Sequence, residues 1–373
     1  MSRVLTTHTG SLPRPELLAE ALTAHDQGQG GGWSSALSQQ LRDAVAERAR
    51  QQVDAGLDVI SDGEMGKFGY ATYVKERLSG FRGEAAGLAL ADLADYPEHA
   101  KDVVLDITTP SCTDPVSYVD TRPVLTDIEN LRAAVNDTAQ HDCFLSAASP
   151  GVIATFLANQ HYTSEEDYLF ALAEAMKTEY DLIHEAGFQV QLDCPDLAMG
   201  RHTSVPPLDA ASFRRQMRMR IEALNHAVRD IPPERLRMHL CWGNYAAPHH
   251  HDIPLGEIIE TVLAARPSTV LFEAANPRHE HEWRVFEEVA LPEGKVVVPG
   301  VIDTLTSYVE HPDLVAERIR RYVDLVGPER VMAGADCGFA TFANFVNIDP
   351  AIAWAKFDSL VRGAERASQL RTG

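Results

Sequence analysis

The sequence predicts an α/β fold, a (β/α)8 TIM barrel with a long insertion after the second strand. Eight short runs rich in Val, Ile, Leu and Phe alternate with longer segments in which apolar residues recur at helical spacing. Such alternation is typical of a parallel sheet covered by helices. An open doubly wound sheet is the alternative prediction, because periodicity does not distinguish a closed sheet from an open one.

The eight strands are expected at residues 3–7, 57–61, 143–149, 188–193, 236–242, 269–274, 295–301 and 330–338. Helices are expected from Pro15 onward, at 37–56, 164–187, 209–231, 255–265 and 312–327, and from about 350. The range from about 80 to 140 fits the repeat poorly and is predicted to be the insertion, with extra strands that cover one end of the barrel. Because a barrel with insertions reaches this size as one unit, residues 1–373 are predicted to form a single domain.

Composition and charge exclude several classes of function. The chain has 54 acidic and 33 basic residues, and its net charge of −21 would repel a nucleic-acid backbone. No apolar run approaches the roughly 18 residues of a membrane helix, and the first residues lack the apolar core of a signal peptide. We therefore expect a cytoplasmic protein with no nucleic-acid or membrane partner. The sequence is compatible with a homo-oligomer. Five scattered cysteines indicate reduced thiols rather than a disulfide framework.

A histidine and a cysteine lie one residue apart in the fifth predicted strand, as His239 and Cys241 in "MHLCW". The pair alone is equally compatible with two core side chains. Because side chains alternate along a strand, however, both project from the same face and can hold one ion. Glu273 and Cys337 come at the ends of the sixth and eighth predicted strands. Thiolates, an imidazole and a carboxylate drawn singly from separate strands predict a catalytic Zn²⁺ rather than a structural one.

Five motifs resemble the cobalamin-independent methionine synthase superfamily, and more closely its epoxyalkane:coenzyme M transferase (2-hydroxypropyl-CoM lyase) branch. The resemblance runs from Thr6 to about Phe345, and it implies a barrel like the carboxyl-terminal half of methionine synthase. The motifs are specific in combination. They are "TTHTGSLPRP", "DGEMGKFGYATYVKERLSGF", "MHLCWGNYAAPHHHD", "FEAANPRHEHEW" and "GADCGFAT".

The resemblance also implies roles for individual residues. The zinc ligands of the family fall on His239, Cys241, Glu273 and Cys337. The residues that hold the carboxylate of the thiol substrate fall on Gly10 and Ser11, and those that bind its amino group fall on Glu64 and Asp193. One position departs from the methionine synthases, which carry a histidine as proton donor in the loop after the seventh strand. Leu305 stands at that position here, which favours the epoxide-opening branch or another alkyl-transfer branch over methyl transfer from folate.

The reaction expected from this resemblance is thiol alkylation. A zinc-bound thiolate would attack an electrophilic carbon, and the main prediction is opening of an epoxide by coenzyme M or a related thiol. The alternative is a cobalamin-independent methyltransferase that makes methionine from homocysteine and a methyl donor. A second alternative is a barrel that zinc stabilises without catalysis. The partners expected are a small-molecule thiol and an alkyl donor, and Glu273 is expected to leave the metal when the thiol arrives.

An opened epoxide carries an alkoxide that needs a proton. The predicted proton donors are Tyr70, Tyr245 and His249, with further histidines at 250, 251, 279 and 281. Asn276 and Arg278 are predicted to bind an anionic end of the substrate, because a guanidinium matches carboxylate and sulfonate groups. A solvated loop residue or a surface salt bridge is the alternative for each. The three other cysteines are expected to be small buried side chains, at 112, 143 and 194.

Overall fold

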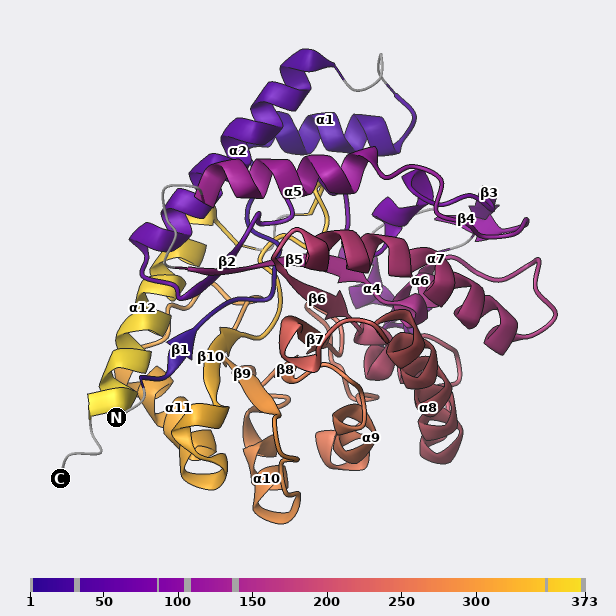
Figure 1. Cartoon of the computed structure of the whole chain (residues 1–373). Coiled ribbons are helices and arrows are strands. Elements are labelled where there is room, and N and C mark those ends of the chain that lie inside the picture. Colours follow the sequence, from indigo (N-terminus) through magenta and orange to yellow (C-terminus); the bar gives the residue numbers. More distant parts are fainter. Residues whose placement is uncertain are drawn as a thin grey trace.

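Eight parallel strands curve into a nearly closed barrel in this computed structural model, which describes residues 3–29, 34–85, 87–103, 109–135, 141–345 and 348–369 (Figure 1). In hydrogen-bonded order they are β1 (Leu5–Thr6), β10 (Met332–Ala335), β9 (Val296–Ile302), β8 (Thr269–Phe272), β7 (Leu236–Leu240), β6 (Gln189–Asp193), β5 (Asp142–Ala148) and β2 (Val59–Ser61). The backbone N–H of Asp58 donates to the carbonyl of Thr6 at 3.1 Å and so links the two end strands. The predicted (β/α)8 barrel is confirmed, and the alternative prediction of an open doubly wound sheet is wrong.

The strands are buried on both faces, as parallel strands inside a shell of helices must be. All five residues of β7 are buried, and six of the seven residues in each of β5 and β9 are buried. This burial explains why these strands read as nearly continuous apolar runs in the sequence rather than as a clean alternation.

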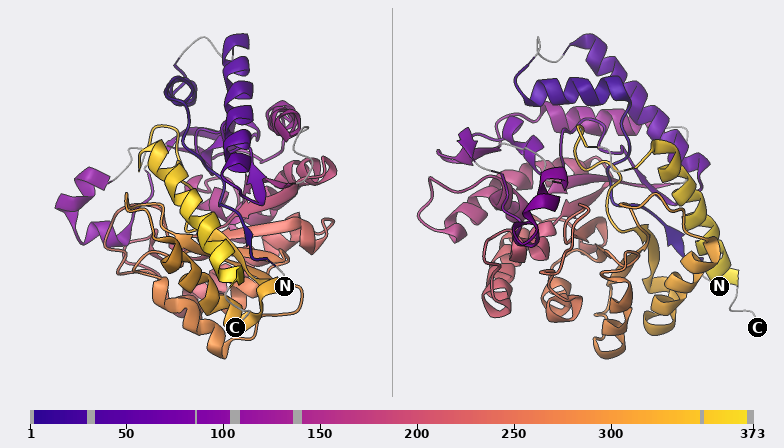
Figure 2. Two further views of the ribbon diagram at one scale, coloured as in Figure 1. Left: turned by 90° about the vertical axis from the view of Figure 1, so that its left-hand side faces the viewer. Right: turned by 180° about the vertical axis from the view of Figure 1, so that it is seen from behind.

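Helices surround the barrel, as both views of Figure 2 show. They are α1 (Glu16–Asp26), α2 (Ser35–Asp54), α5 (Arg122–Val135), α6 (Pro150–Phe156), α7 (Glu165–Glu185), α8 (Ala210–Ala227), α9 (Ile259–Leu263), α10 (Val285–Glu288), α11 (Pro312–Val326) and α12 (Pro350–Gln369). Side-chain caps begin several of them: the Ser164 hydroxyl accepts from Asp167 N, and Asp209 accepts from Ser212 N. The helix predicted at 255–265 is instead a 3₁₀ turn at Leu255–Glu257 followed by the short α9.

The segment between β2 and α5 contains the extra strands that the sequence predicts. They are β3 (Phe81–Ala85) and β4 (Thr109–Cys112), an antiparallel pair apart from the barrel, with α3 (Ala91–Ala94) and α4 (Pro97–Val103) between them (Figure 1). The predicted insertion range of about 80–140 also includes α5, which packs against α2 and α7 on the outside of the barrel. Residues 86, 104–108 and 136–140 of that range lie outside the described residues.

A buried ionic cluster anchors the start of this segment to the barrel helices. Arg77 contacts Asp127 on α5 at 2.7 Å and Glu179 on α7 at 3.2 Å. The hydroxyls of Tyr73 and Tyr118 donate to the two oxygens of Glu179, at 2.6 and 2.7 Å. Burial is the strongest single effect and acts to raise the pKa of Glu179, but the charge of Arg77, a second nearby cation and the two tyrosine hydrogen bonds together outweigh it and hold that pKa below its usual range.

Within the described residues, no helix is both long and apolar enough to cross a membrane.

Candidate active site

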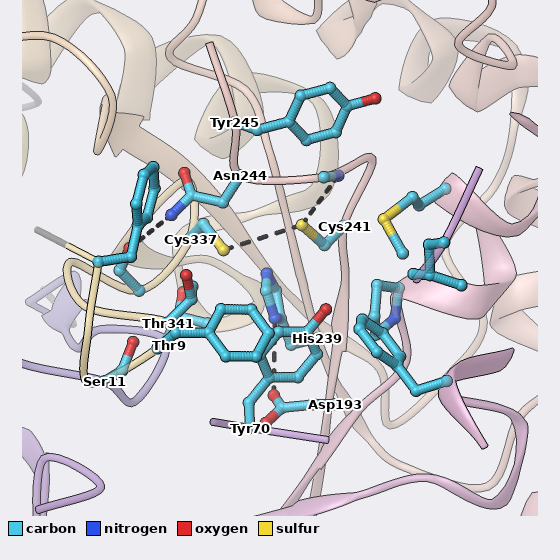
Figure 3. A pocket seen from close by; sticks show the side chains of 18 of the residues that line it. Thr9, Ser11, Tyr70, Asp193, His239, Cys241, Asn244, Tyr245, Cys337 and Thr341 are labelled. Carbon is cyan, nitrogen blue, oxygen red and sulfur yellow. Dashed lines mark hydrogen bonds and ion pairs between the residues drawn. The ribbon is translucent and has the colours of Figure 1, made fainter. Parts of the chain in front are cut away.

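The ends of β7 and β10 bring one histidine and two cysteines together. His239 lies on β7, Cys241 follows that strand, and Cys337 follows β10 (Figure 3). One ligand atom from each of the three lies within 4.8 Å of the others, and the two sulfurs are 3.8 Å apart. All three side chains are buried, with exposed fractions of 4 to 5%. Strand alternation places His239 and Cys241 on one side, and barrel closure brings Cys337 to them.

The imidazole of His239 is oriented for a ligand role. Its Nδ1 lies 3.6 Å from a carboxylate oxygen of Asp193, while its Nε2 is buried and has no hydrogen-bond partner. A histidine that binds a metal through one nitrogen commonly has a carboxylate at the other, which fixes the ring. The orphaned nitrogen and the two sulfurs form a donor set that suits zinc, so these residues fit the predicted Zn²⁺.

Electrostatics at this cluster favour an anionic sulfur. The hydrogen bond with Cys241 outweighs burial and, with help from His239, lowers the pKa of Cys337 to about 6. Burial acts to lower the pKa of His239, but the neighbouring Asp193 and Cys337 raise it to about 10. Zinc bound here would lower the pKa of a coordinated substrate thiol and keep its sulfur nucleophilic.

Glu273, the predicted fourth ligand, follows β8 but does not join this group. One of its oxygens accepts from the backbone N–H of Trp242 at 2.8 Å. The other accepts from Asn276 Nδ2 at 2.8 Å and from Arg278 Nη2 at 2.6 Å. Arg278 also contacts Asp252 at 3.0 Å. Asn276 and Arg278 therefore bind a carboxylate of the protein itself and do not line the cavity, where the sequence placed them against a substrate.

A cavity of about 150 Å³ opens beside His239, Cys241 and Cys337, and these three side chains form part of its wall.

 Its polar wall comes from the loops after β1, β2, β6, β7 and β10. Its apolar wall includes aromatic rings and residues of the segment between β3 and β4. The wall comprises Thr9, Ser11, Glu64, Tyr70, Gly87, Leu88, Val103, Thr109, Phe156, Asp193, Pro195, Met199, His239, Cys241, Gly243, Asn244, Tyr245, Cys337, Gly338, Thr341, Phe342 and Phe345.

Several of these residues were not identified from the sequence. Thr9, Asn244 and Thr341 follow β1, β7 and β10, so their place after strand ends was a usable signal. Leu88 and Val103 come from the segment between β3 and β4, for which the sequence offered no comparable signal. The cavity therefore combines barrel loops with residues of the inserted segment.

Two carboxylates, Glu64 and Asp193, face the cavity with unsatisfied oxygens. Glu64 is 3% exposed and Asp193 is 4% exposed, and one oxygen of each has no hydrogen-bond partner. The oxygen of Asp193 is the one that lies 3.6 Å from His239 Nδ1. Burial and the nearby charge of Asp193 raise the pKa of Glu64 to about 7. Glu64 also adopts a φ of 58°, a strained conformation for a residue with a side chain. Two buried carboxylates at one cavity favour a cationic ligand group.

The surroundings of Glu64 leave room for its carboxylate but supply no free cation. A Cβ added at Gly10 would clash with Glu64 Oε1, so glycine is required beside it, although Gly10 itself does not line the cavity. Arg14 donates to the backbone carbonyls of Ala340 and Glu64, and Lys67 donates to the carbonyl of Ser146. Neither cation lines the cavity, although the charges of both act to lower the pKa of Glu64. Ser11, the other residue of the predicted pair, lines it.

The predicted proton donors lie in different places. Tyr70 lines the cavity, and burial together with the charges of Cys241 and Cys337 raises its pKa well above the usual value. The ring of Tyr245 lines it too, but its hydroxyl points away from the sulfur of Cys241 (Figure 3) and lies 3.1 Å from Asp92. Tyr70 is therefore the better placed of the two tyrosines.

His249 and the other histidines predicted as proton donors lie outside the cavity wall. His249 is buried, with Nε2 at 2.9 Å from the carbonyl of Tyr245 and Nδ1 at 3.1 Å from Asp252. His250 and His251 contact Asp95 near the surface, and His279 contacts Glu282 and Asp252. Neither His281 nor Leu305 belongs to the wall. The three remaining cysteines, at 112, 143 and 194, are buried as expected.

Comparison with known proteins identifies the family to which the chain belongs. Residues 4–349 match the family model described as the catalytic domain of cobalamin-independent synthase. Methionine synthase from Saccharolobus solfataricus is 26% identical over 365 residues, covering 96% of this chain and 93% of that protein. Methionine synthase from Thermococcus kodakarensis is 24% identical over 363 residues, covering 96% and 92%.

A solved structure supports the same fold. The B12-independent methionine synthase from Shewanella sp. W3-18-1, in complex with selenomethionine, superposes with a TM-score of 0.78 at 22% identity, covering 99% of this chain and 98% of that one. The predicted superfamily is confirmed, whereas these comparisons do not show the epoxyalkane:coenzyme M transferase branch and favour the alternative of a methionine synthase-like enzyme. The chain belongs to the family of cobalamin-independent synthase catalytic domains.

Proposed function

We propose that this protein is a zinc-dependent transferase that methylates the thiol of an amino-acid thiol of the homocysteine type. The observation that carries the proposal is the meeting of two groups of side chains at one cavity. His239, Cys241 and Cys337 would hold the metal that binds the substrate sulfur. Glu64 and Asp193, each with an unsatisfied oxygen, would bind an ammonium group on the same molecule.

Other residues complete this assignment. Ser11 lines the cavity and would bind the substrate carboxylate, and Gly10 leaves space for Glu64 beside it. Glu273 would be the fourth metal ligand in the absence of thiol, and its contacts with Asn276 and Arg278 would hold it when it is displaced. Tyr70 would donate a hydrogen bond to the reacting groups from the cavity wall.

Epoxide opening by coenzyme M is less well supported by the site. Coenzyme M ends in a sulfonate, which arginine or lysine would ordinarily bind. Within the described part of the wall there is neither residue, and the two carboxylates would repel an anion. A zinc site that serves only stability is also less well supported, because the three side chains lie at an open cavity and a structural site is normally closed by four ligands.

Glu64→Gln is expected to weaken binding of homocysteine by about 10- to 100-fold, because a hydrogen bond to a charged group contributes about 1.5–3 kcal/mol. Calorimetry on the zinc-loaded protein would measure this affinity. The same variant should leave the affinity for 4-mercaptobutyrate nearly unchanged, since that thiol lacks the amino group. Glu317→Gln, at an exposed position on α11, is the matched control. An equal loss for both thiols would contradict the assignment of Glu64.

Homocysteine binding should also depend on the ionisation of Glu64. Because the pKa of Glu64 is raised to about 7, its carboxylate is present above that pH and is lost as the pH falls below it. The ratio of the affinities for homocysteine and 4-mercaptobutyrate should therefore decrease from pH 8 to pH 6. Taking the ratio removes the proton that either thiol releases on binding. A ratio that stays constant across this range, or that changes equally in Glu64→Gln, would be evidence against the role of Glu64.

A further inference from the structure

We propose that the alkyl donor of this cavity is a small methylated onium cation, a sulfonium or a quaternary ammonium ion, rather than an anionic donor. The proposal rests on the proposed function, because it names the second substrate of the same site. Three features of the cavity support it: its aromatic rings, its charge, and the chemistry of the leaving group.

Aromatic rings from three chain segments form one side of the cavity. Tyr70 follows β2, Phe156 ends α6, and Phe342 and Phe345 follow β10. The ring of Tyr70 lies edge-to-face with two others, with centroids 5.7 Å from Phe156 and 5.6 Å from Phe342. A group of rings around a space attracts a methylated cation, because each ring presents a negative face and the cation gives up little hydration.

The charged residues of the cavity wall do not favour an anionic donor, which lysine or arginine would ordinarily bind. The described part of its wall contains the acids Glu64 and Asp193 but neither lysine nor arginine. The sequence ranges 86, 104–108 and 346–347, which adjoin wall residues along the chain, contain no basic residue either. Arg14 and Lys67, whose charges act on Glu64 across space, donate to backbone carbonyls and do not line the cavity. The cavity therefore attracts cations, which is consistent with a net charge of −21.

An onium donor also removes the need for an acid at the leaving group. The acceptor thiol enters as a thiolate, after its proton has passed to solvent. A new bond forms between its sulfur and the methyl carbon, and the bond from that carbon to the onium sulfur or nitrogen breaks. The electron pair leaves with a neutral thioether or amine, which needs no proton. Within the described residues, the only imidazole of the wall is that of His239. A leaving group that needs no proton therefore fits a wall without a further histidine to act as acid.

Binding measurements with a cation that is not turned over test whether the cavity prefers a cationic ligand. Calorimetry would compare choline with 3,3-dimethyl-1-butanol, its uncharged analogue of the same shape, in the presence of homocysteine. Choline should bind about tenfold more tightly or better, and Phe342→Leu should remove most of that preference. Phe286→Leu, which alters a ring packed between β8 and α11, is the matched control and should retain it. Equal binding of choline and its neutral analogue would overturn the proposal.

Turnover distinguishes the sources of the methyl group. Zinc-loaded protein and homocysteine would be incubated separately with trimethylsulfonium, tetramethylammonium and 5-methyltetrahydrofolate triglutamate, and methionine would be measured by mass spectrometry. Methionine from either onium ion supports the proposal and identifies the element that carries the methyl group. Methionine from the folate alone overturns it while leaving the proposed function intact. Failure with every donor also overturns it, whereas the proposed function is judged separately by the Glu64→Gln affinities.

Discussion

Cys241→Ser is expected to abolish zinc binding and thiol methylation while leaving the fold intact. Zinc content should fall from one ion per chain to nearly none, because serine replaces a thiolate of a three-residue donor set by a weaker hydroxyl ligand. Turnover should fall by about a thousandfold or more, which corresponds to about 4 kcal/mol of transition-state stabilisation. The melting temperature of the metal-free variant should match that of the metal-free parent, since the barrel core is built from other side chains.

The matched control is Cys143→Ser, which changes a buried cysteine of β5 away from the site. It should keep its zinc and its turnover, whatever stability it loses. Zinc content is measured by elemental analysis, and binding of the substrate sulfur by the thiolate-to-metal absorption of cobalt-substituted protein. If Cys241→Ser unfolds while Cys143→Ser remains folded, the metal is structural. A variant that retained full zinc and turnover would rule out Cys241 as a ligand.

Arg77→Met is expected to lower the free energy of unfolding by about 3–5 kcal/mol, because it leaves buried carboxylates without their counter-charge. Arg77 is 4% exposed and contacts both Asp127 and Glu179. Without it, the two tyrosine hydroxyls on Glu179 remain, but they do not neutralise its charge. The segment that carries β3 and β4 loses its attachment to α5 and α7, so thiol binding at the cavity should weaken as well.

Urea unfolding followed by circular dichroism measures this effect. Arg82→Met is the matched control, because Arg82 forms an exposed ion pair with Asp114 at 3.3 Å and should leave stability unchanged. The double variant Arg77→Met/Glu179→Gln should recover part of the loss, since glutamine removes one uncompensated charge. Parental stability in Arg77→Met, or no recovery in the double variant, would contradict a role for the buried ion pairs.

Most strands and helices of the barrel could be predicted from the sequence, because local patterns of apolar residues determine them. Buried parallel strands read as short apolar runs and helices as longer periodic segments, so all eight barrel strands were located. The range 255–265 was harder, because its apolar residues fit one helix although the backbone forms a 3₁₀ turn before α9. In the range 80–140 the extra strands and short helices that precede α5 do not follow the barrel repeat, so the whole range was predicted as one insertion.

At the candidate site, too, some features follow from local sequence pattern and others only from the tertiary structure. The sequence by itself determined that His239 and Cys241 share one side of a strand and that Cys337 ends another, because strand alternation and barrel topology follow from local pattern. Only the tertiary structure decided what Glu273 contacts. Its engagement by Trp242 and Arg278 depends on loops folded against one another, which no spacing along the chain encodes.

The charge of the cavity was likewise decided in three dimensions. Lysines and arginines are frequent in the sequence, but those near the site are bound to backbone carbonyls or to carboxylates of the protein, as Arg14 and Arg278 illustrate. Glu64 and Asp193 each keep one oxygen without a hydrogen bond, because the chain places no donor within hydrogen-bond distance of it; His239 Nδ1 lies 3.6 Å from the Asp193 oxygen. Sequence pattern thus determined which residues reach the end of the barrel, and long-range packing decided which of them remain free to bind a substrate.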